Sequence, residues 1–207
     1  MGFYEEQILP HLIHWACSSD IATHQRKKVV PLASGNVLEI GAGSGLNVPY
    51  YDPARVEKVW LLEPSAALRK KAGSIGADLP FPVEWLPAAA EAIPLPDEVV
   101  DTVLVTYTLC SIEDVETALQ EMHRVLKPGG KFLFCEHGRA PEPRVAQWQS
   151  RLTPYWKRIS GGCHLDRDIP TLLGKAGFRI KHLEQTYLPG WKLFTYHYWG
   201  EAIKNNR

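Results

Sequence analysis

The sequence lacks three features that would place it in a special class of protein. Charge of one sign is not in excess, because 23 Lys and Arg balance 23 Asp and Glu, so no basic surface for a phosphate backbone is indicated. No apolar run approaches the ~20 residues that a transmembrane helix needs. The first residues are acidic, unlike the basic opening of a signal peptide. We therefore expect no nucleic-acid partner and no transmembrane segment.

Cysteine is scarce and scattered. The four cysteines, Cys17, Cys110, Cys135 and Cys163, form no C-x-x-C pair. This spacing predicts neither a zinc site nor a disulfide framework, so we expect no metal and a reducing, cytoplasmic location.

Aromatic residues, by contrast, are plentiful. The 207 residues include seven Trp and eight Tyr, many of them in the last third of the chain. Such side chains suit a pocket for an organic molecule, so we expect a small-molecule substrate. The length fits one α/β domain.

Short β-branched runs alternate with helical patterns, which indicates a parallel sheet wound with helices. The fold class is a Rossmann-like, doubly wound α/β fold with a seven-stranded sheet, mostly parallel with an antiparallel edge strand. Strands are predicted at 36–40, 58–63, 83–86, 100–106, 131–137, 178–185 and 193–199. One or two helices are predicted over 5–28. Further helices are predicted at 65–71, 115–125 and 167–176, the last of them capped by Asp166.

We expect the single domain, 1–207, to contain four segments. These are an N-terminal helical cap (1–34), a cofactor-binding core (35–137), a substrate-side insert (138–168), and a closing helix with strands (169–207). The insert contains Pro and Trp and does not repeat the βα rhythm, so we expect it to cover the active site. Its candidate pocket residues are Trp148, Tyr155, Trp156 and Cys163.

The strongest motif is the glycine loop Gly41-Ala42-Gly43-Ser44-Gly45, directly after the first strand. Its G-x-G-x-G spacing differs from the G-x-G-x-x-G of dinucleotide binders. Glu39 lies at the end of the first strand, where an acid suits an ammonium-bearing ligand. Glu63, after the second strand, is placed to accept the hydroxyls of a ribose.

Four ordered motifs between positions 36 and 137 resemble the class I S-adenosylmethionine-dependent methyltransferases. They are the glycine loop, the segment 90–97, the segment 106–111, and the helix and turn 121–130. One departure is Ala89, where the family often has Asp. The resemblance implies S-adenosylmethionine as cofactor and S-adenosylhomocysteine as product. It also implies cofactor contacts from Glu39, Gly41, Ala42, Gly43, Gly45, Asn47, Glu63, Pro64, Ala90, Glu91, Thr106 and Tyr107.

The C-terminal third resembles a narrower group, the alkyl-thiol methyltransferases. The residues that carry the likeness are 135–138, Trp148, 155–156 and 161–167. The resemblance implies methyl transfer to a small apolar acceptor, with a thiol favoured. Vertebrate members have an N-terminal hydrophobic anchor, and no such run occurs here, so we expect a soluble protein.

His137, at the carboxyl end of the fifth strand, is the candidate catalytic base. It could equally be a structural histidine hydrogen-bonded to the insert. Similar Glu-His and Gly-Cys patterns occur in quinone C-methyltransferases, so O- or C-methylation of a phenol or quinone stays an alternative. A non-catalytic cofactor-binding subunit and an NAD-dependent enzyme are the remaining alternatives.

Overall fold

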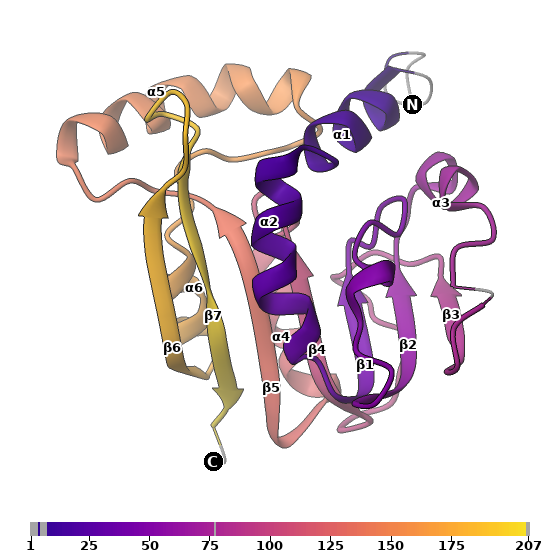
Figure 1. Cartoon of the computed structure of the whole chain (residues 1–207). Helices are drawn as coiled ribbons and strands as arrows, with labels where there is room; N and C mark the ends of the chain where they lie inside the picture. Colours follow the sequence, from indigo (N-terminus) through magenta and orange to yellow (C-terminus); the bar gives the residue numbers. More distant parts are fainter. Residues whose placement is uncertain (1–3, 5–7, 77, 206–207) are drawn as a thin grey trace.

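The computed structural model describes residues 4, 8–76 and 78–205. Its centre is a seven-stranded sheet with the strand order β3-β2-β1-β4-β5-β7-β6 (Figure 1). The strands are β1 (Gly35–Ile40), β2 (Val56–Leu62), β3 (Val83–Leu86), β4 (Val100–Thr106), β5 (Leu126–His137), β6 (Phe178–Tyr187) and β7 (Tyr196–Lys204).

The sheet is mixed. Strands β1 to β5 pair in parallel, whereas β7 runs antiparallel to both β5 and β6. This arrangement confirms the predicted doubly wound sheet with an antiparallel pair at one edge. The chain leaves β1 toward β2 on one side and returns to β4 on the other, so the carboxyl ends of β1 and β4 form the crevice where such sheets bind ligands.

Helices cover both faces of the sheet (Figure 1). They are α1 (Leu9–Cys17), α2 (Asp20–Val29), α3 (Ala66–Ala72), α4 (Val115–Val125), α5 (Pro143–Ile159) and α6 (Ile169–Lys175). Alternate residues of each central strand enter two separate cores. In β1, Leu38 belongs to the same core as Leu119 of α4, and Val37 belongs to the other core, together with Val29 of α2. This alternation is what a strand buried on both faces requires.

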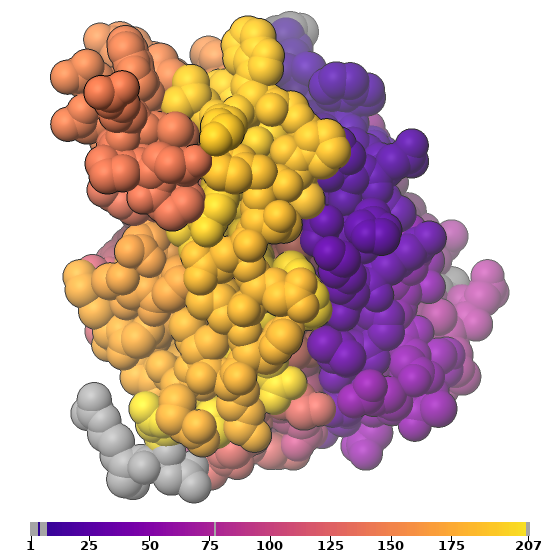
Figure 2. All heavy atoms as spheres, turned by 60° about the vertical axis from the view of Figure 1, so that its left-hand side comes forward, coloured from indigo at the N-terminus to yellow at the C-terminus, as the bar shows by residue number. Residues whose placement is uncertain are grey.

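The N-terminal and C-terminal parts of the chain lie side by side on the surface (Figure 2). Helix α2, drawn in indigo, contacts β7, drawn in yellow. The ammonium group of Lys28 lies 5.5 Å from the centre of the Trp199 ring. In β7 the side chain of Tyr196 is buried, whereas Trp199 is half-buried.

Over 5–28, where one or two helices were expected, the described residues form two. The chain is divided at Ser18-Ser19 into α1 and α2, and Ser19 accepts from the N–H of Ala22 as the cap of α2; residues 5–7 lie outside the described residues. The prediction that Asp166 caps the helix 167–176 is wrong. Asp168 caps α6 and accepts from the N–H of Thr171. The Asp166 carboxylate instead accepts from the hydroxyl of Thr153, 3.2 Å away.

The insert contains the longest helix of the described chain. Helix α5 spans 17 residues and begins with Pro143, where the ring costs no helical hydrogen bond. Proline and tryptophan content hid this helix from the sequence pattern. The division of the chain into four segments stays a prediction. Among the described residues, no helix combines the length and the apolar character that spanning a bilayer requires.

Candidate functional site

The glycine loop turns sharply out of β1 at the crevice. Gly41, Gly43 and Gly45 all have positive φ, between 58° and 75°. A Cβ on Gly41 would lie 2.3 Å from the Thr108 side chain, so this glycine permits close approach of the loop after β4. A Cβ on Gly43 would meet only the carbonyl of Gly41, 3.9 Å away. The loop therefore leaves open space at its middle glycine.

Glu63 lies directly after β2 and is 6% exposed. One carboxylate oxygen accepts from the N–H of Gly43 at 2.9 Å, and the other accepts from the N–H of Ser65 at 2.8 Å. Burial raises the pKa of Glu63, while the two backbone hydrogen bonds lower it. Because a carboxylate has about four acceptor positions, each oxygen keeps capacity for one hydroxyl.

Glu39 is 1% exposed at the end of β1. Its two oxygens accept from the amide of Asn47 at 2.9 Å and from the hydroxyl of Tyr51 at 2.6 Å. Burial raises the pKa of Glu39 to about 7, against these hydrogen bonds and the charge of Arg26, which lower it. A nearby cation would stabilise the ionised form of this acid.

Asn47 connects the ends of β1 and β4. Its amide also donates to the hydroxyl of Thr106 at 2.9 Å. Its Oδ1 atom is buried and has no hydrogen-bond partner among the described residues. Tyr107 follows with a φ of 56°, which is rare outside glycine and turns the chain away from β4 toward the crevice.

These groups fit S-adenosylmethionine. The open space at Gly43 could receive a ligand close to the backbone, Glu63 has free acceptor capacity that would suit two ribose hydroxyls, and Glu39 is an acid that would suit the ammonium group. The orphaned Oδ1 of Asn47 offers a further acceptor. When bound, the cofactor supplies an electrophilic methyl group on a sulfonium.

The segment after β3 lies beside the same crevice. Ala90 is buried and Glu91 is half-buried. The segment is held by Arg124 of α4, whose guanidinium donates to the carbonyls of Ile93 at 3.0 Å and Leu95 at 2.8 Å. Of the remaining predicted cofactor residues, Ala42 is buried in the loop and Pro64 is exposed after Glu63.

His137, at the end of β5, lies next to Cys163 of the loop between α5 and α6. The Nε2 atom of His137 lies 3.1 Å from the Sγ atom of Cys163. Cys110, which the sequence motif contained without a role, completes a group whose ligand atoms lie within 4.8 Å of one another. The hydrogen bond with Cys110 and burial both raise the pKa of Cys163, so its thiol is protonated in the free protein.

The three aromatic pocket candidates lie on α5 and differ in exposure. Trp148 is 55% exposed and Tyr155 is 70% exposed. Trp148 lines a surface groove with Trp191 of the loop between β6 and β7. Trp156 is half-buried and packs on Phe194, with ring centres 4.9 Å apart. Trp156 is therefore the most enclosed of the three, and their role in a pocket stays a prediction.

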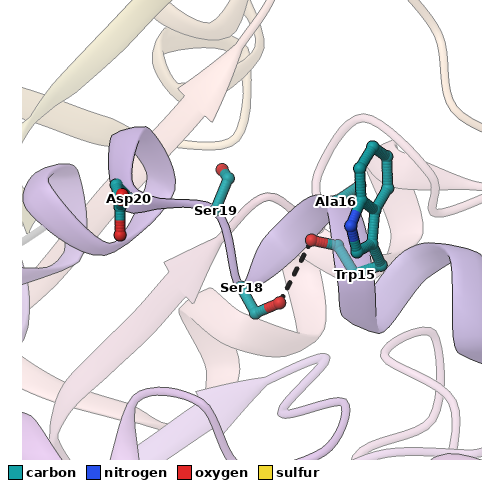
Figure 3. A pocket seen from close by; sticks show the side chains of 5 residues that line it. All are labelled: Trp15, Ala16, Ser18, Ser19 and Asp20. Carbon is teal, nitrogen blue, oxygen red and sulfur yellow. Dashed lines mark hydrogen bonds between the residues drawn. The ribbon is translucent and has the colours of Figure 1, made fainter.

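Helix α1 connects two loops of the crevice. The Nδ1 atom of His14 lies 2.7 Å from the hydroxyl oxygen of Ser44 in the glycine loop. At the other side, Leu9 and Ile13 lie 3.2–3.3 Å from where a Cβ of Gly161 would be. A separate hollow at the junction with α2 contains no predicted site residue (Figure 3); its lining is Trp15, Ala16, Ser18, Ser19 and Asp20.

Some residues of the site could not be identified from the sequence, because their hydrogen-bond partners are far away in the chain. Tyr51, which bonds Glu39, and His14, which bonds Ser44, lie in no motif. Glu136 was part of a motif but had no assigned role. It is fully buried, and one oxygen accepts from the N–H groups of Thr108 at 2.7 Å and Leu109 at 3.1 Å. In the sequence, the only signal for Glu136 is that an acid directly precedes the candidate base His137.

Comparison with known proteins places the chain among methyltransferases. A family model described as a methyltransferase domain matches residues 38–134. The chain is 35% identical to thiol S-methyltransferase TMT1B of Rattus norvegicus over 173 residues, which cover 81% of this chain and 70% of that protein. It is 32% identical over 110 residues to the ubiquinone/menaquinone biosynthesis C-methyltransferase UbiE of Rubrivivax gelatinosus, covering 53% of this chain and 42% of that protein.

A solved structure supports the fold. A SAM-dependent methyltransferase of Thermotoga maritima superimposes with a TM-score of 0.69 at 23% identity, with 97% of each chain covered. The geometry of the crevice, the matched methyltransferase domain and the extent of the similarity to the rat protein all indicate the same family. This chain belongs to the thiol S-methyltransferase family and is an enzyme that uses S-adenosylmethionine as its methyl donor.

Proposed function

We propose that this methyltransferase methylates the sulfur of a small apolar thiol. The observation that carries the proposal is the 35% identity to a rat thiol S-methyltransferase over 81% of the chain. The likeness extends beyond the cofactor-binding core, which is what a shared acceptor class requires. The likeness to the quinone C-methyltransferase covers 53% of the chain and supports the alternative acceptor more weakly.

The chemistry at the strand ends agrees with a thiol. A thiol with a pKa near 8.5 is already partly ionised at neutral pH and is an intrinsically strong nucleophile. It therefore needs little help from a base, whereas a phenol or a carbon acid needs more. His137 contacts Cys163 at 3.1 Å, so its Nε2 atom already has a partner. A free general base is not required for the reaction we propose.

The proposed cofactor contacts are those expected from the sequence. Gly41, Ala42, Gly43 and Gly45 surround the methionine part, Glu63 accepts the ribose hydroxyls, and the remaining predicted residues complete the crevice. The reducing location expected from the scattered cysteines stays a prediction.

An acceptor panel tests the proposal. The protein is incubated with S-adenosylmethionine carrying a labelled methyl group and with matched alkyl thiols, phenols and quinols. We expect a product heavier by one methyl group only with thiols, detected by mass spectrometry. Turnover with the phenols or quinols and none with thiols would establish the O- or C-methylation alternative. Cofactor binding without turnover of any acceptor would instead indicate a non-catalytic subunit.

A further inference from the structure

We propose that Cys110, His137 and Cys163 form a three-ligand site for a zinc-type divalent ion whose open position binds the sulfur of the acceptor. The Cys and His ligand atoms lie within 4.8 Å of one another, and the His137 and Cys163 atoms are 3.1 Å apart. Around a tetrahedral zinc ion, with Zn–S about 2.3 Å and Zn–N about 2.0 Å, neighbouring ligand atoms are roughly 3.5–3.8 Å apart. Small side-chain movements would therefore complete the site.

Backbone contacts hold two of the ligands in place. The N–H of His164, next to Cys163, donates to the carbonyl of Cys110 at 2.7 Å. Gly162 has a φ of 86°, and a Cβ there would lie 3.0 Å from the carbonyl oxygen of Ser111. Glycine thus lets the two loops cross closely, so both sulfur atoms are positioned before any ion binds.

The third ligand is tied to the same loop through its neighbour. Glu136 precedes His137 in β5, and its carboxylate accepts from the N–H groups of Thr108 and Leu109. The guanidinium of Arg167 donates to the carbonyl of Leu109 from the far side. Because these bonds hold the segment that leads into Cys110, the three ligands belong to one braced unit.

The ligand chemistry favours zinc and explains why the site tolerates burial. Two soft thiolates and one neutral imidazole suit this ion, and the two thiolates neutralise its two charges. Cys110 is buried, whereas His137 and Cys163 are partly exposed. Three protein ligands leave one tetrahedral position open, as in catalytic rather than structural zinc sites.

The proposed metal site adjoins the cofactor crevice. Thr108, two residues before Cys110, has its hydroxyl 3.4 Å from the carbonyl oxygen of Gly41 in the glycine loop. This part of the inference rests on the proposed thiol methylation. On coordination the acceptor thiol loses its proton to solvent and stays a thiolate. Its sulfur then forms the new bond to the methyl carbon as the carbon–sulfonium bond breaks, and that electron pair stays on the departing sulfur.

The inference goes against the expectation from cysteine spacing. That expectation depends on ligands that are close in sequence, whereas these three come from the ends of two strands and from a loop beyond α5. In this arrangement His137 is a metal ligand rather than a base.

Metal binding by the reduced full-length protein is the test. After treatment with a chelator, the protein is titrated with zinc, and the bound metal is counted by mass spectrometry. Cobalt then replaces zinc, and absorption reports thiolate-to-cobalt charge transfer. We expect one ion per chain. Cys163→Ser and Cys110→Ser should each weaken binding by about a hundredfold or more. Cys17→Ser, which changes a cysteine outside the group, should bind as the wild type does.

Retained circular dichroism and cofactor binding show that each variant is folded, and the half-buried Cys163 serves if the Cys110 variant does not fold. No bound ion at micromolar zinc, or equal binding by the Cys163 and Cys17 variants, would overturn the site. The cobalt spectrum should also shift on addition of an alkyl thiol but not of the matching alcohol. No shift would overturn the role of the open position.

The outcomes separate this inference from the proposed function. Thiol turnover by metal-free protein would leave the proposed function standing and would overturn the coordination of the acceptor. Zinc binding without turnover of any thiol would keep the metal site and would refute thiol methylation.

Discussion

Glu39 and Glu63 are two buried acids at neighbouring strand ends, but their partners differ. Side chains satisfy Glu39, whereas backbone N–H groups satisfy Glu63. The hydrogen bonds to Glu39 can rearrange when the charge of this acid changes, because its partners Tyr51 and Asn47 are polar side chains. The backbone partners of Glu63 fix the position of its carboxylate relative to the glycine loop. The two acids therefore suit different parts of one ligand.

Replacing Glu63 by Ala should weaken cofactor binding. If Glu63 accepts the two ribose hydroxyls as proposed, the change removes a charged acceptor that is worth about 2–3 kcal/mol. Glu63→Gln is the matched control, because it keeps the size and one acceptor oxygen, and it should lose less. Calorimetry with S-adenosylmethionine measures both. Unchanged affinity in the Ala variant would place the ribose elsewhere.

Cofactor binding at pH 6 should release up to about one proton. The pKa of Glu39, ordinarily 4.5, is about 7 in the free protein, so this acid is largely protonated at that pH. Since the fold favours its neutral form, stability decreases as the pH rises from 4.5 to about 7. An ammonium group beside it reverses the preference and expels the proton.

Calorimetry in buffers of different ionisation enthalpy counts the released protons. Glu39→Gln cannot ionise but keeps one carbonyl oxygen for Asn47 or Tyr51, so the release should disappear. Equal release by the variant would assign the proton to another group.

At the scale of elements, the loop between β1 and η3 (Val48–Tyr50) adopts backbone conformations that favour glycine and is held in place by its neighbours. Its glycines adopt positive φ, and the N–H of Ala42 donates to the carbonyl of Leu62 at 3.0 Å. Thr108, in the segment after β4, contacts the loop from the other side. The loop is thus braced from the strands on both sides of β1, which limits the entropy lost when a ligand binds.

Gly43→Ala should reduce cofactor affinity by at least about tenfold. The added methyl points into the open space that the ligand needs, and the positive φ adds roughly 1–2 kcal/mol of strain. Gly129→Ala is a matched control, because Gly129 has a φ of 72°, has nothing within 4 Å of its Cβ position, and lies near the start of β5.

Both variants should lose similar stability in thermal unfolding. Only the change at Gly43 should alter affinity. A variant at Gly43 that binds as well as the one at Gly129 would show that the ligand does not approach this loop.

At the scale of the whole molecule, the order of strands produces the site. Glu39 and Glu63 come from strands that pair directly, and the segment after β4 meets the glycine loop because β4 lies on the other side of β1. Helix α1 joins the glycine loop to the loop at Gly161. A ligand in the crevice therefore contacts segments from most of the chain.

Saturating cofactor should stabilise the entire domain. At a concentration of 100 Kd the gain is about 2.7 kcal/mol. For a domain of this size each kcal/mol raises Tm by about 2–4 °C, so we expect an increase of roughly 5–11 °C. NAD at the same concentration should have no effect. A shift with NAD and none with S-adenosylmethionine would contradict the cofactor assignment.

Local patterns predicted most of the elements. The strands 83–86 and 100–106 and the helix 115–125 coincide with β3, β4 and α4, since the periodicity of apolar residues depends on neighbouring positions. Helix α5 was not predicted, because proline and aromatic residues obscured the helical spacing of its apolar residues. The cap of α6 was displaced by two residues because Asp166 has a tertiary partner in Thr153.

The sequence by itself determined the individual strands, the glycine loop and the motifs that carry the family resemblance, because each depends on residues close together in the chain. Only the tertiary structure decided which distant side chains meet: Tyr51 with Glu39, His14 with Ser44, and Cys110 with His137 and Cys163. Such meetings depend on strand order and on loops that cross. No local pattern encodes them, because they follow from the free energy of the whole fold.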